Sequence, residues 1–376
     1  MWAVAALAGL IVVATGVVDG PSALAVLREV GPVLGFLAAI TVVAELADAA
    51  GVFDAAAHVA ARAGRGSVRL LFALVLVLAF GTTLVLSLDT TAVLLTPVVL
   101  VTARRLAIPA LPFAMATVWL ANTASLLLPI SNLTNLLAMN RLGLSVTGFA
   151  RHMWLPALAA FGVTALVLGV RYRKLLTGGY VAPHFEPPPD RTLFRISALT
   201  CAVLGPLFVA GADVPITAGL AAVFLIVVFA VRRPRALVWS LVPWRLVLLV
   251  SGLFLVVRAG QDYGLGTLLT HAAGTSGSAP GLLRVASVAA LAANLVNNLP
   301  AFAALSPVAG GSVPRTLAVL IGTNLGPLVL LWGSLATLLW RERCEAMGLK
   351  VSAREFAMVG LAGVPILLTT ATLSIR

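Results

Sequence analysis

Long apolar runs separated by short polar stretches dominate the pattern of this 376-residue chain. A helix needs about 20 apolar residues in succession to cross the hydrocarbon core of a bilayer. Helices are expected, because a backbone that crosses lipid has to satisfy its own polar groups. We therefore predict an all-α integral membrane protein with about nine spanning helices, near residues 2–18, 30–47, 112–140, 154–170, 196–212, 214–231, 246–257, 316–340 and 356–375.

Two further apolar runs are too long for one spanning helix and too short for two. The run 69–105 has one charge, Asp89, near its middle and arginines at both ends. The run 284–315 contains Asn297, Asn298 and a proline near its middle. We expect each run to form a re-entrant helical hairpin, since non-helical backbone at membrane depth is tolerated where protein buries it or where it lines a wet cavity.

Composition and charge support a membrane location and fix a predicted orientation. Residues are 61% hydrophobic and only 10% charged, against about 25% charged residues in a typical soluble domain. The net charge of +12 does not indicate nucleic acid, because basic residues in short loops set the orientation of membrane proteins. Placing most of the 25 Lys and Arg in the cytoplasm puts the N-terminus and the first hairpin on the cytoplasmic side, and the second hairpin and the C-terminus outside.

A weak internal repeat of opposite topology accompanies this pattern. Each half reads as a span, a hairpin, a helix interrupted by polar residues with Gly or Pro, and another span. At an offset of 202 residues the paired positions are Asn122 with Asn324, Asn132 with Ser334, and Asn135 with Thr337. Interrupted helices in corresponding positions of two halves are the sequence pointer to the binding site of a secondary transporter.

The repeat divides the chain into four predicted parts. A first span and loop cover 1–29, and a linker with two spans covers 172–244. Repeat 1 is 30–171, with its hairpin at 69–105 and its broken helix at 112–140; repeat 2 is 245–376, with its hairpin at 284–315 and its broken helix at 316–340.

Polar residues at the hairpin tips and helix breaks are the candidate substrate-binding residues. A carboxyl group in a membrane costs several kcal/mol unless it faces a wet cavity or a partner. Asp89 is therefore the candidate proton carrier or substrate ligand, or alternatively the N-cap of a helix that starts at Thr90. Amides and hydroxyls can bind a neutral trihydroxy metalloid or a cation, but they also form hydrogen bonds between membrane helices. The full candidate set is Asp89, Thr90, Thr91, Asn122, Ser131, Asn132, Asn135, Asn297, Asn298, Gly333, Ser334 and Thr337.

The sequence offers no cofactor or metal site and no catalytic set. An intramembrane enzyme would need paired aspartates, a Ser-His pair or a zinc motif, and Asp89 is isolated. The two cysteines are far apart, and no histidine has a ligand-spaced companion; the histidines are His58, His152, His184 and His271. We therefore expect a transporter, with a channel as a weaker alternative.

Several of these segments resemble the membrane subunit of arsenical pumps. That family belongs to the ion transporter superfamily, which also holds divalent-anion and citrate carriers. The resemblance covers nearly the whole chain and is carried by residues 89–92, 122–126, 131–135, 297–300 and 325–327, and above all by 333–340.

This resemblance implies export of arsenite and antimonite across the plasma membrane, driven by the proton gradient or the membrane potential. It also implies a homodimer and, in some members, a cytosolic ATPase partner. The sequence departs from the family where Asn122 and Asn324 replace an acid and Leu328 replaces a lysine. A rival interpretation is a citrate or other organic-anion symporter, although those carriers typically have Ser-Asn-Thr at both hairpin tips.

Overall fold

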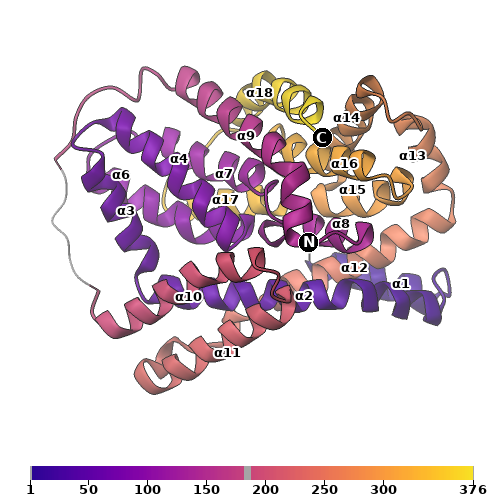
Figure 1. Ribbon diagram of the computed structural model, residues 1–376, viewed down its shortest axis with the longest axis horizontal. Helices are drawn as coiled ribbons and strands as arrows, with labels where there is room; N and C mark the ends of the chain where they lie inside the picture. Colours follow the sequence, from indigo (N-terminus) through magenta and orange to yellow (C-terminus); the bar gives the residue numbers. More distant parts are fainter. Residues whose placement is uncertain (1, 182–187, 376) are drawn as a thin grey trace.

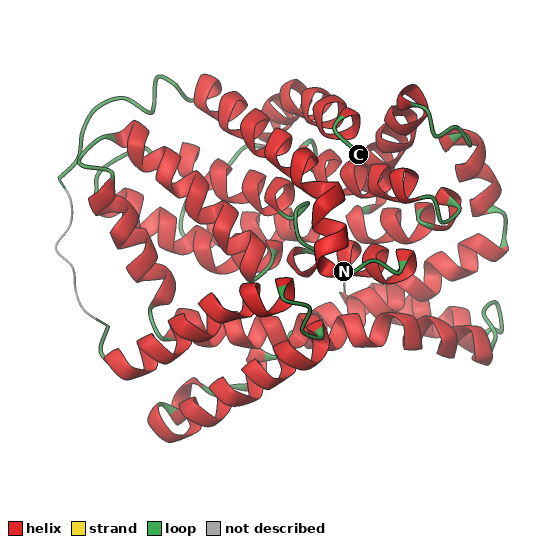
Figure 2. Ribbon diagram, in the orientation of Figure 1, coloured by secondary structure: helices red, strands yellow, loops and turns green. Residues whose placement is uncertain are grey.

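The computed structural model describes residues 2–181 and 188–375. Within these ranges every regular element is helical (Figure 2), apart from one isolated antiparallel bridge between Ser67 and Gly179. The prediction of an all-helical membrane protein is confirmed, since 8 helices of the described chain are long and apolar enough to span. They are α2 (Gly20–Ala49), α4 (Val68–Val85), α9 (Val146–Arg171), α10 (Arg191–Val209), α11 (Val214–Arg232), the segment Trp239–Asp262 that contains α12 (Trp244–Asp262), α14 (Ala279–Val296) and α18 (Ala353–Leu373).

These eight helices are not the nine spans expected from the sequence. The first expected span is α1 (Trp2–Ala14), whose 13 residues give about 20 Å of helix, less than the core thickness of about 30 Å. The expected spans 112–140 and 316–340 are interrupted, so neither contains a single helix of spanning length. Conversely, α4 and α14 are long enough to span and are also the first legs of the two predicted hairpins. Their re-entrant course in the bilayer stays a prediction.

The helices lie in two layers (Figure 1). The lower layer in this view consists of α1, α2, α10, α11 and α12, with α1 packed along α12, and α2 packed against α10, α11 and α12. The upper layer consists of α4 to α9 and α14 to α18. Its remaining helices are α5 (Leu88–Thr90), α6 (Thr96–Arg105), α7 (Leu111–Ala124), α8 (Leu133–Leu142), α15 (Asn298–Leu305), α16 (Val313–Leu325) and α17 (Leu335–Ala346).

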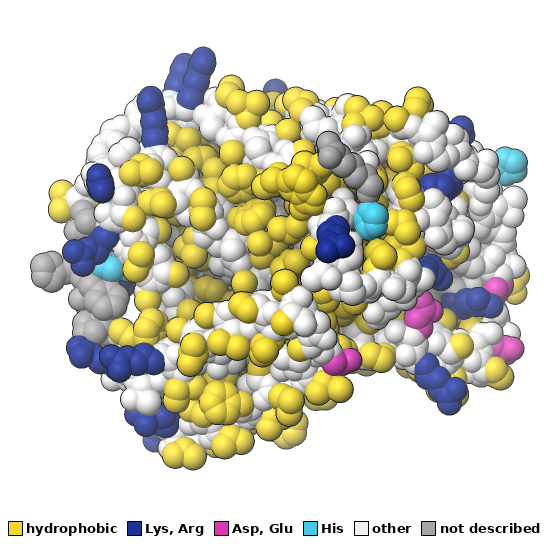
Figure 3. Space-filling view, in the orientation of Figure 1, with side chains coloured by type: hydrophobic (Ala, Val, Ile, Leu, Met, Phe, Trp, Pro, Cys, Tyr) yellow, Lys and Arg dark blue, Asp and Glu magenta, His cyan; other side chains and the backbone are white. Residues whose placement is uncertain are grey.

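Hydrophobic side chains cover much of the face seen in Figure 3, and most Lys and Arg side chains lie toward the ends of its long axis. Many large apolar residues are exposed, including Leu220 in α11 and Leu166 in α9. Water would penalise this surface, whereas lipid does not. The exposed apolar surface therefore belongs against acyl chains.

The order of elements repeats more fully than the sequence predicts. The series α2, α3 (Val52–Ala63), first hairpin, α7, α8 and α9 matches the series α12, α13 (Leu265–Ala273), second hairpin, α16, α17 and α18. The short helices α3 and α13 each follow a left-handed glycine, Gly51 at φ 85° and Gly264 at φ 91°. We did not predict these helices, because their 12 and 9 residues are too few to show as spans.

Candidate substrate site

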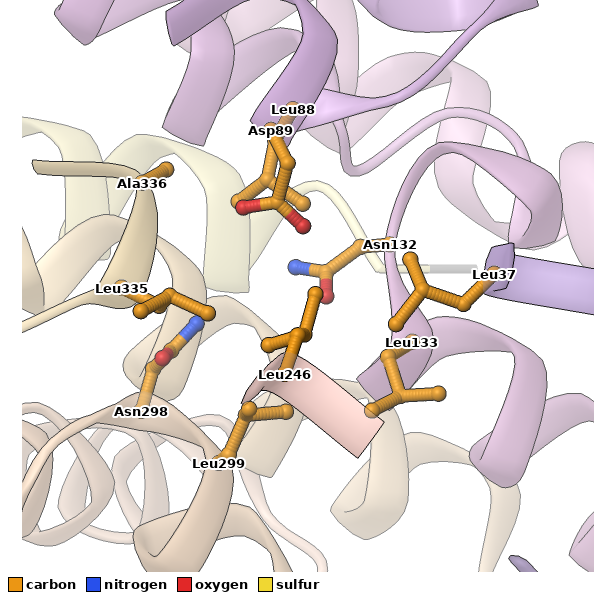
Figure 4. Close-up of a pocket in the computed structure, with 10 residues that line it drawn as sticks. All are labelled: Leu37, Leu88, Asp89, Asn132, Leu133, Leu246, Asn298, Leu299, Leu335 and Ala336. Carbon is orange, nitrogen blue, oxygen red and sulfur yellow. The ribbon is translucent and has the colours of Figure 1, made fainter. Parts of the chain in front are cut away.

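A small cavity lies where both hairpins, both broken helices and the lower layer meet. Its volume is about 20 Å³, which is room for roughly one water molecule. In Figure 4 the Asp89 carboxyl and the Asn132 amide point toward one another, and Asn298 lies across the space from them. We call it the central cavity; its lining residues are Leu37, Leu88, Asp89, Asn132, Leu133, Leu246, Asn298, Leu299, Leu335 and Ala336.

The first hairpin turns at Ser87, which has a positive φ of 136°. Ser87 Oγ accepts a hydrogen bond from the Thr90 backbone N–H at 3.3 Å, so Ser87 is the N-cap of the returning leg. The alternative expectation, that Asp89 is this N-cap, is therefore wrong. Asp89 lies within α5 instead, where its side chain lines the central cavity.

The hydroxyls beside Asp89 bond within the hairpin. Thr91 Oγ1 lies 2.8 Å from Thr83 Oγ1, and Thr90 Oγ1 lies 3.2 Å from Ser87 Oγ. A π-helical turn, Thr91–Leu95, follows them, a local widening often found at functional sites. Thr90 and Thr91 are thus positioned to hold the tip around Asp89 and do not line the cavity.

The break between α7 and α8 presents Asn132 to the cavity. Pro129 opens a short 3₁₀ turn that ends at Ser131, and Asn132 then adopts extended backbone before α8 begins. Asn132 Oδ1 caps α8 by accepting from the Thr134 N–H at 3.2 Å. Ser131 Oγ donates to the Leu84 carbonyl at 3.2 Å, which ties this break to the first hairpin.

Asn324 of α16 joins the two halves of the chain. Its Oδ1 accepts from Asn132 Nδ2 at 2.9 Å and from Thr134 Oγ1 at 3.3 Å. Its Nδ2 donates to Asn135 Oδ1 at 3.0 Å, while Asn135 Nδ2 donates to the Ser125 carbonyl at 2.6 Å. All of these side chains are buried. The amide of Asn132 is therefore held in place by a residue from the other half.

Asn122, the repeat partner of Asn324, has no such role. Its Nδ2 donates to the Val118 carbonyl one turn earlier in α7, at 2.9 Å. Its Oδ1 is buried and has no hydrogen-bond partner among the described residues. At the matching break of repeat 2 the polar side chains bond each other. Ser334 Oγ lies 2.8 Å from Thr337 Oγ1 and accepts from the Thr337 N–H. The two copies of this element order thus have unequal hydrogen bonding.

The second hairpin turns at Asn297, which also has a positive φ, of 86°. Asn297 Nδ2 donates to the Trp332 carbonyl at 3.0 Å, and Trp332 Nε1 donates to the Asn294 carbonyl at 2.8 Å. Asn294 Nδ2 also bonds the Gly326 carbonyl at 2.7 Å. These bonds fasten the hairpin to the break between α16 and α17. Asn298, which follows the tip, lines the cavity and has a buried Oδ1 without a partner in the described chain.

Gly333 acts through close backbone packing. A Cβ at this position would lie 2.8 Å from Pro327 Cα and 3.2 Å from Asn294 Oδ1. Such distances are too short for any larger residue without movement of the break. Gly333 was a candidate substrate-binding residue from the sequence, but it does not line the cavity and instead allows the close packing of the break.

The central cavity offers one acidic group, two amides and apolar walls. None of its ten lining residues is basic. The Asp89 carboxyl makes no hydrogen bond or ion pair with the residues that the structure describes. The Asp89 carboxyl and the Asn298 amide therefore have hydrogen-bonding capacity left for a small polar ligand, whereas Asn132 already bonds Thr134 and Asn324.

No group of three His, Cys, Asp or Glu residues within the described ranges could hold a metal ion. His184 lies outside the described residues. Cys201 and Cys344 are buried free thiols.

Seven of the ten lining residues were not candidates from the sequence, and neither was Asn324, which bonds Asn132. Leu37 of α2 and Leu246 of α12 close the cavity from the lower layer, and nothing distinguishes them from other leucines in apolar runs. Asn324 entered the sequence analysis as the repeat partner of Asn122 and as a departure from the family pattern, but not as a site residue. The alignment of the two halves pairs it with Asn122 and gives no sign of its bond to Asn132.

An all-helical membrane protein whose interrupted helices and hairpin tips meet at one cavity has the architecture of a secondary transporter. Residues 1–337 match the citrate transporter family, and the chain belongs to that family.

The relatives and the fold agree with this class. The arsenical pump membrane protein of Escherichia coli K12 is 28% identical, covering 99% of this chain and 92% of its own length. The arsenical pump membrane protein of Yersinia enterocolitica is 29% identical, covering 90% of this chain and 85% of its own length. A 46 kDa membrane protein of Mycobacterium leprae is 26% identical, covering 88% of this chain and 82% of its own length. The crystal structure of the YdaH transporter of Alcanivorax borkumensis shares the fold, with a TM-score of 0.58 at 14% identity, covering 95% of this chain and 88% of that one.

Proposed function

We propose that this membrane transporter exports a trivalent metalloid, arsenite or antimonite, by secondary active transport coupled to protons or to the membrane potential. The observation that carries the proposal is the chemistry of the central cavity. One carboxyl group, two amides and a wall of leucines suit the chemistry of a compact neutral oxyacid, whose hydroxyls both donate and accept hydrogen bonds, and binding it requires the cavity to open beyond its volume of about 20 Å³.

A citrate or other organic-anion symporter is the second candidate, because the chain belongs to the citrate transporter family. A di- or tricarboxylate would need cationic or strongly donating groups to replace its hydration. The cavity has no basic side chain, and Asp89 would repel a carboxylate. These features favour the metalloid, as do the relatives that are named arsenical pump membrane proteins.

Asp89 is the proposed coupling residue. Burial in lipid disfavours an unpaired carboxylate, so a proton and a polar substrate are alternative ways to stabilise this group. Substrate binding would release the proton, and proton binding from the other side would release the substrate. Asn132 and Asn298 would orient the substrate, and Thr90, Thr91, Ser131 and Asn135 would support the tips and the break.

The orientation in the membrane belongs to the same proposal. The N-terminus would be cytoplasmic and the C-terminus external, which follows from the distribution of Lys and Arg. The homodimer and the cytosolic ATPase partner remain predictions from the family resemblance.

The test is arsenite uptake into everted membrane vesicles that carry the protein, with and without an imposed proton gradient. We expect gradient-dependent accumulation by the parent chain. Asp89→Asn should abolish the dependence on the gradient, because its amide cannot carry a proton in this pH range, while Asp89→Glu should retain part of it. Asp54→Asn, an exposed acid in α3, is the matched control and should transport normally.

Normal gradient-dependent uptake by Asp89→Asn would overturn the coupling role of this residue. Lack of arsenite accumulation by a folded, correctly inserted parent would overturn the metalloid assignment. Citrate uptake by the same vesicles would then establish the rival substrate class.

A further inference from the structure

A second and larger cavity lies on the same helices as the central cavity. Its volume is about 130 Å³, and its polar lining side chains are Glu29, Arg141, Arg258, Gln261 and Ser306. We propose that this cavity is the outer vestibule of the transport route, and that it binds a small polyhydroxy oxyacid or oxyanion through its arginines. The inference rests on the proposed function and extends it to a second binding position.

The register of α8 shows how the two cavities are related. Leu133 lines the central cavity, and Leu137 and Arg141 line the larger one. Residues four and eight positions apart lie on one face of a helix. Eight residues correspond to about 12 Å along the axis. The larger cavity thus lies about two turns further along the face of α8 that forms the wall of the central cavity.

Three other helices show the same relation. Each contributes at least one residue to the central cavity and, on it or directly after it, at least one to the larger cavity, so both cavities lie between the lower layer and the upper layer. The pairs are Leu37 and Glu29 on α2, Leu246 and Arg258 on α12, and Leu299 and Ser306 on and directly after α15. Because the same four helices line both cavities, we infer one route between the layers that includes the central cavity and the larger cavity.

The predicted topology places the larger cavity on the outer side. The start of α2, the end of α8 and the end of α12 all lie in or beside loops assigned to the exterior by the distribution of Lys and Arg. The cavity is lined by exposed residues such as Glu29 and Arg141, so it communicates with the surface.

Donor groups dominate the polar chemistry of this vestibule. Arg141 donates to Ser306 Oγ at 2.6 Å, which links α8 to the end of the second hairpin. Gln261 Nε2 donates to the Ala304 carbonyl at 2.7 Å, which links α12 to the same hairpin. Arg258 is paired with Asp262 at 3.3 Å, an exposed contact that leaves other guanidinium donors free. Two planar guanidinium groups around one space match a ligand with several oxygens on a compact centre.

The vestibule differs from the central cavity in its charged groups. Arg141, Arg258 and Glu29 line the vestibule, whereas the central cavity holds only the acid Asp89. An oxyacid that leaves Asp89 would therefore meet positive charge on its way out. The guanidinium groups there offer a neutral oxyacid new hydrogen bonds away from the coupling residue.

The experiment measures substrate affinity separately on the two sides of everted vesicles, whose lumen corresponds to the cell exterior. Radioactive arsenite is added outside, and unlabelled arsenite is loaded into the lumen at graded concentrations to drive exchange. In Arg258→Gln we expect the half-maximal luminal concentration to rise about tenfold, as loss of one charge-assisted hydrogen bond predicts. The half-maximal concentration on the cytoplasmic side should stay unchanged.

Arg151→Gln is the matched control, because Arg151 is an exposed arginine near the start of α9, also on the predicted outer side, and does not line the vestibule. An unchanged luminal constant in Arg258→Gln would overturn the vestibule as a binding position. Equal changes on both sides would also overturn it, since they would place the effect at the central cavity.

A second measurement does not depend on the substrate. Val257→Cys, which lines the vestibule, should react in intact cells with a membrane-impermeant maleimide, as should the exposed control Tyr263→Cys beyond the end of α12. Thr102→Cys, between the two legs of the first hairpin, should not react. If the parent does not transport arsenite, only the proposed function fails, and labelling of Val257→Cys still supports an outer vestibule. Absence of labelling at Val257→Cys, with Tyr263→Cys labelled, would overturn it.

Discussion

Asn324 and Asn122 show how one residue type at matching positions can have different consequences. Asn324 uses both ends of its amide to bond Asn132, Thr134 and Asn135 across the two halves. Asn122 bonds only a carbonyl of its own helix and leaves its oxygen unpaired in a buried position. Buried polar groups without partners cost about 1–3 kcal/mol each, so the two residues contribute unequally to the fold.

Replacement of these two asparagines should reveal that inequality. Asn324→Ala leaves Asn132 Nδ2 and Asn135 Oδ1 without partners, and we expect a loss of roughly 2–4 kcal/mol in stability. Asn122→Ala removes one bond to a carbonyl of its own helix together with an oxygen that is already unpaired, and should cost roughly 1 kcal/mol or less. Thermal unfolding of the purified protein in detergent compares them. An equal fall in Tm for both variants would contradict the bonding described here.

The sequence alone identified part of this site. Asp89, Asn132 and Asn298 line the central cavity as candidates from the sequence, because a polar group in an apolar run has few tolerable positions. Thr90 and Thr91 instead bond within the hairpin, since a hydroxyl one residue along a helix points about 100° away. The direction of each side chain depends on the residue at which its helix starts, and the pattern of polar residues in the sequence does not determine that residue.

At the scale of elements, α14 and α16 approach closely because α16 carries glycine where they touch. A Cβ at Gly322 would collide with the Ala286 carbonyl oxygen and the Ala289 side chain of α14. A Cβ at Gly326 would similarly meet Ala290. Small residues at a helix contact allow backbones to pack tightly in membranes, where apolar burial from water contributes little.

Gly322→Ala should therefore destabilise the protein. Forcing one methyl group into this contact is expected to cost roughly 1–3 kcal/mol. Gly219→Ala in α11 is the control, because a Cβ there meets nothing within 4 Å and alanine favours helix. Chemical unfolding or Tm in detergent measures the difference. A Gly322→Ala variant as stable as Gly219→Ala would show that the two helices can separate at no cost.

Breaks in helices are easier to predict than the helices' roles. Pro129 and the pair Gly326 and Pro327 marked both interruptions, since these residues disfavour continued helix. The first legs of the hairpins could not be distinguished from spanning helices by length, because α4 and α14 have 18 residues each and a spanning helix needs about 20. The amphipathic helices α3 and α13 were missed, as their polar faces resemble loops in an apolar chain.

At the scale of the molecule, the linker between the repeats is fastened at its ends. Asp190 caps α10 by accepting from the N–H groups of Thr192 and Leu193. The same carboxylate accepts from Arg232 at the end of α11, at 2.8 Å. Arg233 donates to the Ala49 carbonyl at the end of α2, at 2.6 Å. One aspartate and two arginines thus hold the start of α10, the end of α11 and the end of α2 together.

The pH dependence of this junction follows from the hydrogen bond between Asp190 and Arg232, which lowers the pKa of Asp190 to about 2. A lowered folded-state pKa gives stability that is present above the unfolded value, near 3.8, and is lost as the pH falls toward 2. Asp190→Asn keeps the cap but not the charge. We expect the parent to have the higher Tm at pH 6, and the difference to vanish between about pH 4 and pH 2.

Asp213→Asn is the control for this comparison, because Asp213 caps α11 and makes no ion pair with the described residues. High salt should also reduce the advantage of the parent, since the Asp190 contact is exposed. A Tm difference that persists unchanged at pH 2 would exclude the carboxylate as its source.

The unequal hydrogen bonding of Asn324 and Asn122 affects the relative populations of the conformations of the unloaded transporter. Two halves with the same order of elements and opposite topology could in principle exchange roles, which would give two conformations of equal energy related by a pseudo-two-fold axis in the membrane plane. The bonds that only Asn324 makes remove that degeneracy. Every difference of about 1.4 kcal/mol between two conformations changes their populations tenfold. Asn324→Ala should therefore alter the waiting time of the unloaded protein on each side, and its turnover rate reports that shift wherever the fold survives.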